Sequence, residues 1–172
     1  AAQGDVEACY QLVVYFENQF FSTEVEEAQQ RVNLLVDASN AKHAAASLLL
    51  GRWYLQGHYV EANLQHAIAF FEFAANECQS SDAYNELANL YLQGVFVVVN
   101  QEKAMHYLKK AVALKNAEAT YAYAVLLLNH DLEQAFALLQ SNYQEQQHQQ
   151  SAKFLFYSQA FPFESVAIWL AD

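Results

Sequence analysis

The sequence predicts an all-α protein that is built as a stack of about five antiparallel helix pairs. Three observations lead to this prediction: the amino-acid composition favours helices, glycine and proline are scarce, and one sequence pattern returns after 37 residues. The chain has 172 residues, which is long enough to bury a sizeable hydrophobic core.

The composition excludes most β architectures. The chain contains one proline and four glycines, whereas an all-β domain needs a turn about every 8–12 residues. Hydrophobic residues make up 55% of the sequence, and the abundant alanine, leucine, glutamine and glutamate all have good helix propensity. The composition therefore predicts helices throughout.

The charge balance disfavours two classes of partner. Eight basic residues stand against 19 acidic ones, which gives a formal net charge of −11. Nucleic acids and anionic membrane surfaces are normally bound by basic faces, so we expect neither partner here. The longest apolar tracts, residues 95–99 and 125–128, are far shorter than the roughly 20 residues of a membrane span. We expect no direct membrane insertion.

The redox state and the compartment stay open at this stage. Cys9 and Cys78 lie 69 positions apart, and two cysteines do not form a disulfide framework. The sequence starts at Ala1 without an initiator methionine, which is compatible with a processed N-terminus or with a segment of a longer protein. The bacterial periplasm, secretion and the cytoplasm are all compatible with these features.

The repeat is clearest in two stretches that begin at Ala46 and Ala83, 37 residues apart. If each alanine is position 1, both stretches carry leucine at position 5, a small residue at 6, tyrosine at 9, glycine at 12, valine at 15, asparagine at 18 and alanine at 22. No gap is needed to align them. So many coincidences indicate an internal repeat.

Each repeated position has a structural explanation. Positions 1, 5 and 9 are four apart and form one buried stripe of a first helix, and the small residue at 6 lets a second helix approach. Gly57 and Gly94 are expected to end the first helix in a left-handed conformation. Asn63 and Asn100 are expected to cap the start of the second helix.

The pattern continues more loosely on both sides. Ala119 starts a third copy with a shortened loop, and Ala152 starts another, with a turn expected at residues 161–163 and a last helix at 165–170. Upstream, Ala8 starts a unit whose second helix includes Val32 and Leu35. We expect a single repeat domain with units at about 8–45, 46–82, 83–118, 119–150 and 151–172.

The pattern A-x3-L-G-x2-Y-x2-G-x-G-V-x2-D-x2-K-A resembles the Sel1-like repeat, which is related to the TPR repeat. The best match runs from Ala83 to Ala104, and it departs from the family pattern where Phe96 replaces a glycine and Asn100 an acidic residue. The resemblance implies a right-handed α/α superhelix. The opening residues 1–8 resemble a junction between two repeats, which implies that the chain is a segment of a longer array.

No residue pattern predicts a metal, a cofactor or a catalytic site. His58 and His66 lack cysteine or carboxylate partners at a known ligand spacing. His148 lies in the glutamine-rich stretch 144–150, which we expect to be a solvated loop or a frayed helix end. We therefore expect no cofactor and no bound metal.

Ser39 and Lys42 form an S-x-x-K sequence, as in penicillin-recognising enzymes, but no accompanying K-T-G occurs. The simpler interpretation places Ser39 and Asn40 at a turn between helices. The family resemblance also links some Sel1-like proteins to penicillin binding, with a disulfide inside each repeat that this chain lacks. We expect no enzyme. The alternative is a penicillin-interacting protein, or one that binds a cell-wall or sugar ligand.

The family resemblance implies that the first helices of the units line a concave surface on which a protein or peptide binds. By analogy with TPR proteins, the expected contact positions are Tyr10, Val14, Glu17, Leu48, Arg52, Leu55, Asn85, Asn89, Leu92, Tyr121, Val125 and Leu128. On this interpretation the chain is a non-enzymatic adaptor or scaffold. The remaining alternatives are a structural spacer, or self-association through exposed array ends such as Trp169 and Leu170.

Overall fold

The computed structural model describes the backbone of residues 3–19 and 25–160, and this part of the chain contains nine α-helices and no strand. The turn and helix expected at residues 161–170 lie outside it, as do Trp169 and Leu170. The helices are α1 (Gln3–Gln19), α2 (Val25–Asn40), α3 (Ala44–Gln56), α4 (Leu64–Asn76), α5 (Ser81–Gln93), α6 (Gln101–Ala113), α7 (Ala117–Leu127), α8 (Leu132–Gln146) and α9 (Gln149–Ala160).

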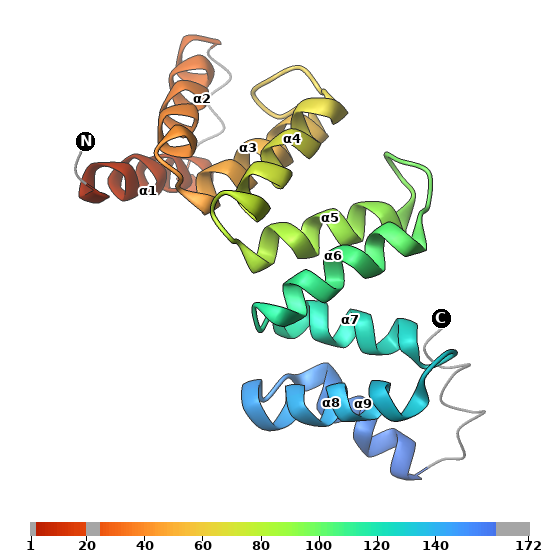
Figure 1. Cartoon of the computed structure of the whole chain (residues 1–172). Coiled ribbons are helices and arrows are strands. Elements are labelled where there is room, and N and C mark those ends of the chain that lie inside the picture. Colours follow the sequence, from red (N-terminus) through yellow and green to blue (C-terminus); the bar gives the residue numbers. More distant parts are fainter. Residues whose placement is uncertain (1–2, 20–24, 161–172) are drawn as a thin grey trace.

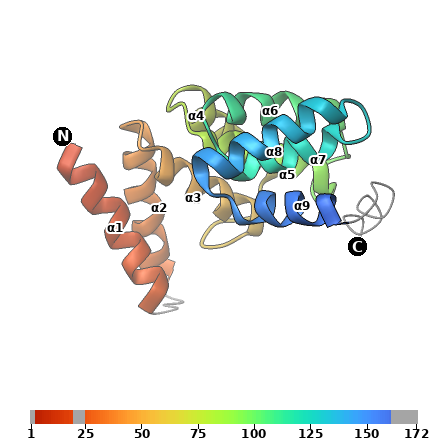
Figure 2. The ribbon, with the colours of Figure 1, turned by 90° about the horizontal axis from the view of Figure 1, so that it is seen from below.

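The helices follow one another along a curved path from α1 to α9 (Figure 1). Seen from below, α4, α6 and α8 form one layer, and α5, α7 and α9 lie beneath it (Figure 2). The extensive contacts all join helices that are neighbours in sequence. Contacts limited to neighbouring units define a solenoid, so the predicted all-α solenoid is confirmed.

Repeated caps define where the helices begin and end. Asn63 and Asn100 each accept a hydrogen bond from the backbone N–H three residues later, as predicted. Gly57 and Gly94 adopt φ values of 74° and 66°, in the left-handed region where a side chain would be strained. Both predictions for the ends of the helices are therefore confirmed.

The stripe predicted for the first helices forms the core. Ala46 and Leu50 are fully buried in α3, and Ala83 and Leu87 are fully buried in α5. The tyrosines at position 9 are half-buried and stack on aromatic rings of the following helix, Tyr54 on Phe70 and Tyr91 on Tyr107. The same packing thus recurs in two successive helix pairs.

Tyr107 also links two helices of the even-numbered layer. Its hydroxyl donates a hydrogen bond to Oε1 of Glu72 on α4 at 3.3 Å. Burial disfavours the phenolate, and the carboxylate of Glu72 disfavours it further, so the pKa of Tyr107 is raised to about 12.

This shift predicts a loss of stability in alkali that the variant Tyr107→Phe does not share. Because the folded chain holds the phenol proton more tightly than the unfolded chain, the stabilisation is present below pH 10 and lost as the pH rises towards about 12. Urea unfolding of both proteins across this range measures the difference. Tyr143→Phe, at an exposed tyrosine, is the control. Identical pH dependence for wild type and Tyr107→Phe would contradict the assignment.

The stretch 144–150 differs from the expectation of a solvated loop or frayed end. Helix α8 continues to Gln146, Gln147 takes a left-handed conformation with φ 51°, and His148 then caps α9. The side chain of His148 is only 9% exposed. The other residues of the stretch are exposed, as expected. The expectation was wrong for His148, because composition alone did not show that this histidine closes a helix junction.

Candidate functional site

The residues expected to contact a partner lie on α1, α3, α5 and α7, the first helices of their pairs, except Leu128, which directly follows α7. We call these twelve residues the odd-helix strip. Tyr10 and Val14 are half-buried on α1, whereas the side chain of Glu17 lies outside the described residues. The strip thus draws on four helices, and α5 contributes three of its residues.

The leucines of the strip are shared between the core and the surface. Leu48 is 8% exposed and belongs to the central hydrophobic core. Leu55, Leu92 and Leu128 are partly buried and pack against the same core. They leave a partial apolar surface, and Leu48 contributes least to it.

Arg52 does not present an unbalanced positive charge. Its guanidinium on α3 donates two hydrogen bonds to Oε1 of Glu86 on α5, one of them from Nε at 3.0 Å. A surface ion pair of this kind contributes at most about 1 kcal/mol to stability. Its main consequence is electrostatic, because the only basic residue of the strip is already neutralised.

Asn85 and Asn89 have unused hydrogen-bonding capacity. They lie four residues apart and therefore on one face of α5. Both are half-buried, and neither side chain has a hydrogen-bond partner within the described part of the chain. Each amide group offers donors and an acceptor, as a peptide backbone requires.

Tyr121 and Val125 extend the strip onto α7, where both are half-buried. Burial raises the pKa of Tyr121, and the negative charge of Glu118 raises it further. The phenol therefore remains protonated at neutral pH and can donate a hydrogen bond.

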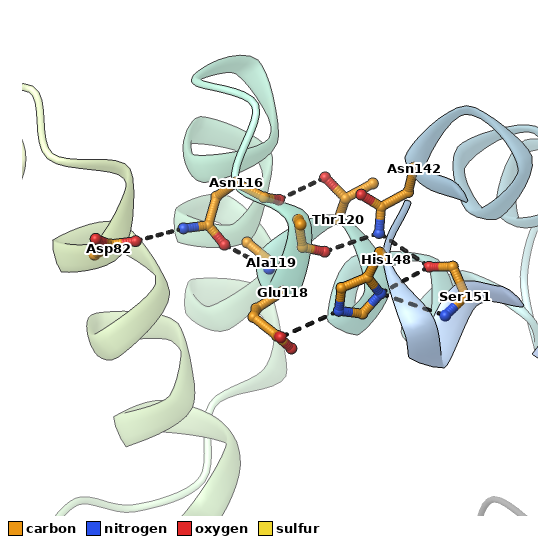
Figure 3. A network of polar contacts seen from close by, with 9 residues as sticks. Asp82, Asn116, Glu118, Ala119, Thr120, Asn142, His148 and Ser151 are labelled. Carbon is orange, nitrogen blue, oxygen red and sulfur yellow. Dashed lines mark hydrogen bonds and ion pairs between the residues drawn. The ribbon is translucent and has the colours of Figure 1, made fainter. Parts of the chain in front are cut away.

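A polar network closes the junction of α7, α8 and α9 (Figure 3). Asn142 donates hydrogen bonds to the carbonyl oxygen of Ala117 and to Oγ of Ser151, both at 2.9 Å. Nδ1 of His148 lies 3.0 Å from this Oγ, and its Nε2 lies 3.1 Å from Oε1 of Glu118. The network fixes α9 against the preceding helix pair.

Two serines of the described residues have a basic residue close in the sequence, Ser151 with His148 and Ser39 with Lys42. Neither serine is an accessible nucleophile. Ser151 is fully buried beside His148, and its hydroxyl is engaged in the junction network. Ser39, the last residue but one of α2, is buried and bonds to Oγ of Ser47 at 2.7 Å. Lys42 instead reaches Oε2 of Glu77 at 3.1 Å. The S-x-x-K sequence therefore does not assemble a serine–lysine site.

Three further observations concern the described residues. No cluster of three or more histidine, cysteine or acidic side chains there has an arrangement that suits a metal ion. None of the helices has the length and apolar character needed to cross a membrane. Cys9 and Cys78 are both free thiols, and burial raises the pKa of Cys78.

Comparison with known proteins identifies the family. The Sel1 repeat matches residues 44–77 and 81–116, which correspond to the pairs α3–α4 and α5–α6. The chain therefore contains two Sel1 repeats. No curated protein sequence matches this Sel1-like chain.

Two solved structures share the fold. A Sel1 repeat protein from Oxalobacter formigenes superposes with a TM-score of 0.66 at 20% identity, covering 81% of this chain and 58% of that one. A protective antigen present in uropathogenic Escherichia coli strains, which displays an SLR fold, gives a TM-score of 0.63 at 20% identity. The match covers 83% of this chain and 31% of that one. The Sel1-like chain thus spans 58% and 31% of the two structures.

Sel1 repeats typically form non-catalytic scaffolds for protein interaction, and this chain shares their TPR-like solenoid fold. The sequence located the helices of the strip, but it did not reveal the pairing of Arg52 with Glu86. The signal was present, since opposite charges lie 34 residues apart, close to one repeat length.

Proposed function

We propose that this chain is an adaptor or scaffold segment that binds a partner protein through the odd-helix strip. The observation that carries the proposal is the pair of unpartnered amides, Asn85 and Asn89, on one face of α5. Half-buried amides without internal partners have donors and acceptors free to bond to a bound peptide backbone.

The chemistry around the amides favours an extended, largely uncharged peptide segment. Leu55 on α3, Leu92 on α5 and Leu128 at the end of α7 supply partly exposed apolar surface. Arg52 is already paired with Glu86, so the strip offers no free cation for a carboxylate. Apolar contacts would supply affinity, and the amides would fix the position of the peptide backbone.

The test is quantitative affinity capture from an extract of the native host. We expect the double variant Asn85→Ala/Asn89→Ala to bind the captured protein roughly tenfold more weakly, because two hydrogen bonds of about 0.5–1.5 kcal/mol each are lost. Arg52→Ala is expected to have a smaller effect, since its charge is neutralised inside the chain.

The matched control replaces two exposed amides of the even-numbered layer, Gln101→Ala/Gln140→Ala. It removes the same chemical groups and should leave capture unchanged. Equal recovery of partner by wild type and by Asn85→Ala/Asn89→Ala would remove the support for the strip.

A further inference from the structure

The connection between α5 and α6 carries the most exposed apolar side chains of the described structure. Val95, Phe96, Val98 and Val99 are 70%, 47%, 89% and 59% exposed. We call residues 95–99 the valine loop. In Figure 1 the connection between α5 and α6 projects beyond the ends of both helices.

The preceding repeat provides an internal comparison for the valine loop. Residues 58–62 occupy the equivalent positions, and the two loops have the same anchors at both ends. Gly57 and Gly94 are left-handed, and the backbone N–H of Asn63 or Asn100 donates to the carbonyl oxygen of Tyr54 or Tyr91. The path of the loop therefore does not require five apolar residues.

The two loops differ in how their side chains are used. In the first loop, Tyr59 and Val60 pack against a hydrophobic core, and His58, Glu61 and Ala62 occupy the other positions. The valine loop has Val95, Val98 and Val99 at those three positions. Val99 lies against Gly94, but most of the surface of all three valines is exposed, so they contribute little to the packing of this chain.

The backbone of the valine loop is also available. Its N–H and C=O groups make no backbone hydrogen bond within the described part of the chain. β-Branched and aromatic residues favour extended pairing, and an uncharged segment without proline is suited to it. Such a segment resembles an exposed strand edge that natural proteins usually protect with charges.

We propose that the valine loop is a self-association surface, and that a second copy of this chain covers it with the same five residues. Two identical apolar segments can meet about a two-fold axis, each burying the side chains of the other. Charge also favours this contact. Each chain carries −11, but residues 91–101 contain no charged side chain, so two copies approach there with the least repulsion.

The size of the surface sets the expected strength. Two five-residue segments bury far less than the roughly 1,200 Å² of a stable interface, so the dimer should be weak, with a Kd on the order of 1 mM. Added salt should strengthen it, because screening reduces the repulsion between the two acidic chains and leaves the apolar contact intact. An interface held by ion pairs would show the opposite dependence on salt.

Sedimentation analysis of the chain over a wide concentration range, at low and high salt, tests the proposal. We expect concentration-dependent dimerisation that salt enhances and that Val95→Ser/Val98→Ser abolishes. The substitutions keep the net charge and change exposed side chains, and circular dichroism verifies the fold. The control Ala62→Ser changes the equivalent loop of the preceding repeat and should dimerise like wild type.

Two results would overturn the proposal. A wild-type chain that stays monomeric at every concentration and salt would show that a second copy does not cover the loop. Undiminished dimerisation of Val95→Ser/Val98→Ser would place the contact elsewhere, for example at the ends of the array. Neither result bears on the odd-helix strip, which lies on α1, α3, α5 and α7.

Discussion

The variant Gly51→Val is expected to lower the free energy of unfolding by about 3 kcal/mol, the upper end of the range for overpacked cores. Gly51 is buried where α3 crosses α4. A Cβ atom at this position would lie 2.4 Å from Cε1 of Phe71 and 2.6 Å from its Cδ1. The ring is itself buried and cannot move away. The control Ala69→Val places the same residue on an exposed position of α4, and urea unfolding measures both. A small effect of Gly51→Val would contradict the close approach of the two helices.

The next repeat suggests a compensating substitution. Ala88 and Leu108 occupy the positions of Gly51 and Phe71, 37 residues later, and both are fully buried. A larger residue on the first helix thus accompanies a smaller one on the second. We expect Phe71→Leu to offset part of the cost of Gly51→Ala, with a coupling free energy of about 0.5–3 kcal/mol. Strictly additive effects in the double-mutant cycle would show that the two positions do not interact.

The second large effect is expected at the junction of α7, α8 and α9. Asn142→Ala removes both hydrogen bonds that its amide donates, to Ala117 and to Ser151, in a buried site. Each lost hydrogen bond costs about 0.5–1.5 kcal/mol, although the hydroxyl of Ser151 keeps its contact with Nδ1 of His148. The loss is partly offset, because Oδ1 of Asn142 has no hydrogen-bond partner within the described residues of the folded chain.

Hydrogen exchange can locate this effect. Because units of a solenoid depend on their neighbours, the amides of α9 should exchange faster in Asn142→Ala, whereas those of α3 and α4 should change little. Ser141→Ala is the matched control, since its hydroxyl makes an exposed bond to Glu145 on the same helix. A uniform change along the whole chain would contradict local anchoring by Asn142.

The sequence predicted the repeated parts of the fold because each position has the same physical task in every unit. Glycine ends a helix where φ is positive, and asparagine caps the next one, so both could be recognised at Gly57, Asn63, Gly94 and Asn100. Features that depend on contacts between units were harder to predict. Arg52 and Glu86 lie on the first helices of two successive units. Their pairing depends on how the two units pack together, which the sequence of a single repeat does not show.

Two further features were missed for other reasons. His148 was hidden by the glutamines around it, although Ser151 three residues later was compatible with a helix cap. The exposure of the valine loop contradicts the usual rule that apolar residues are buried. Apolar residues that serve an interface and those that serve a core look alike in a sequence.

The central claim is that a partner protein binds the odd-helix strip, and site-specific cross-linking tests it most directly. A photoreactive amino acid replaces Asn89 on α5 in one protein and the exposed Lys109 on α6 in another. After illumination in the native host extract, we predict a discrete cross-linked product from position 89 that is absent from position 109. The same product from position 109, with none from position 89, would contradict binding at the strip.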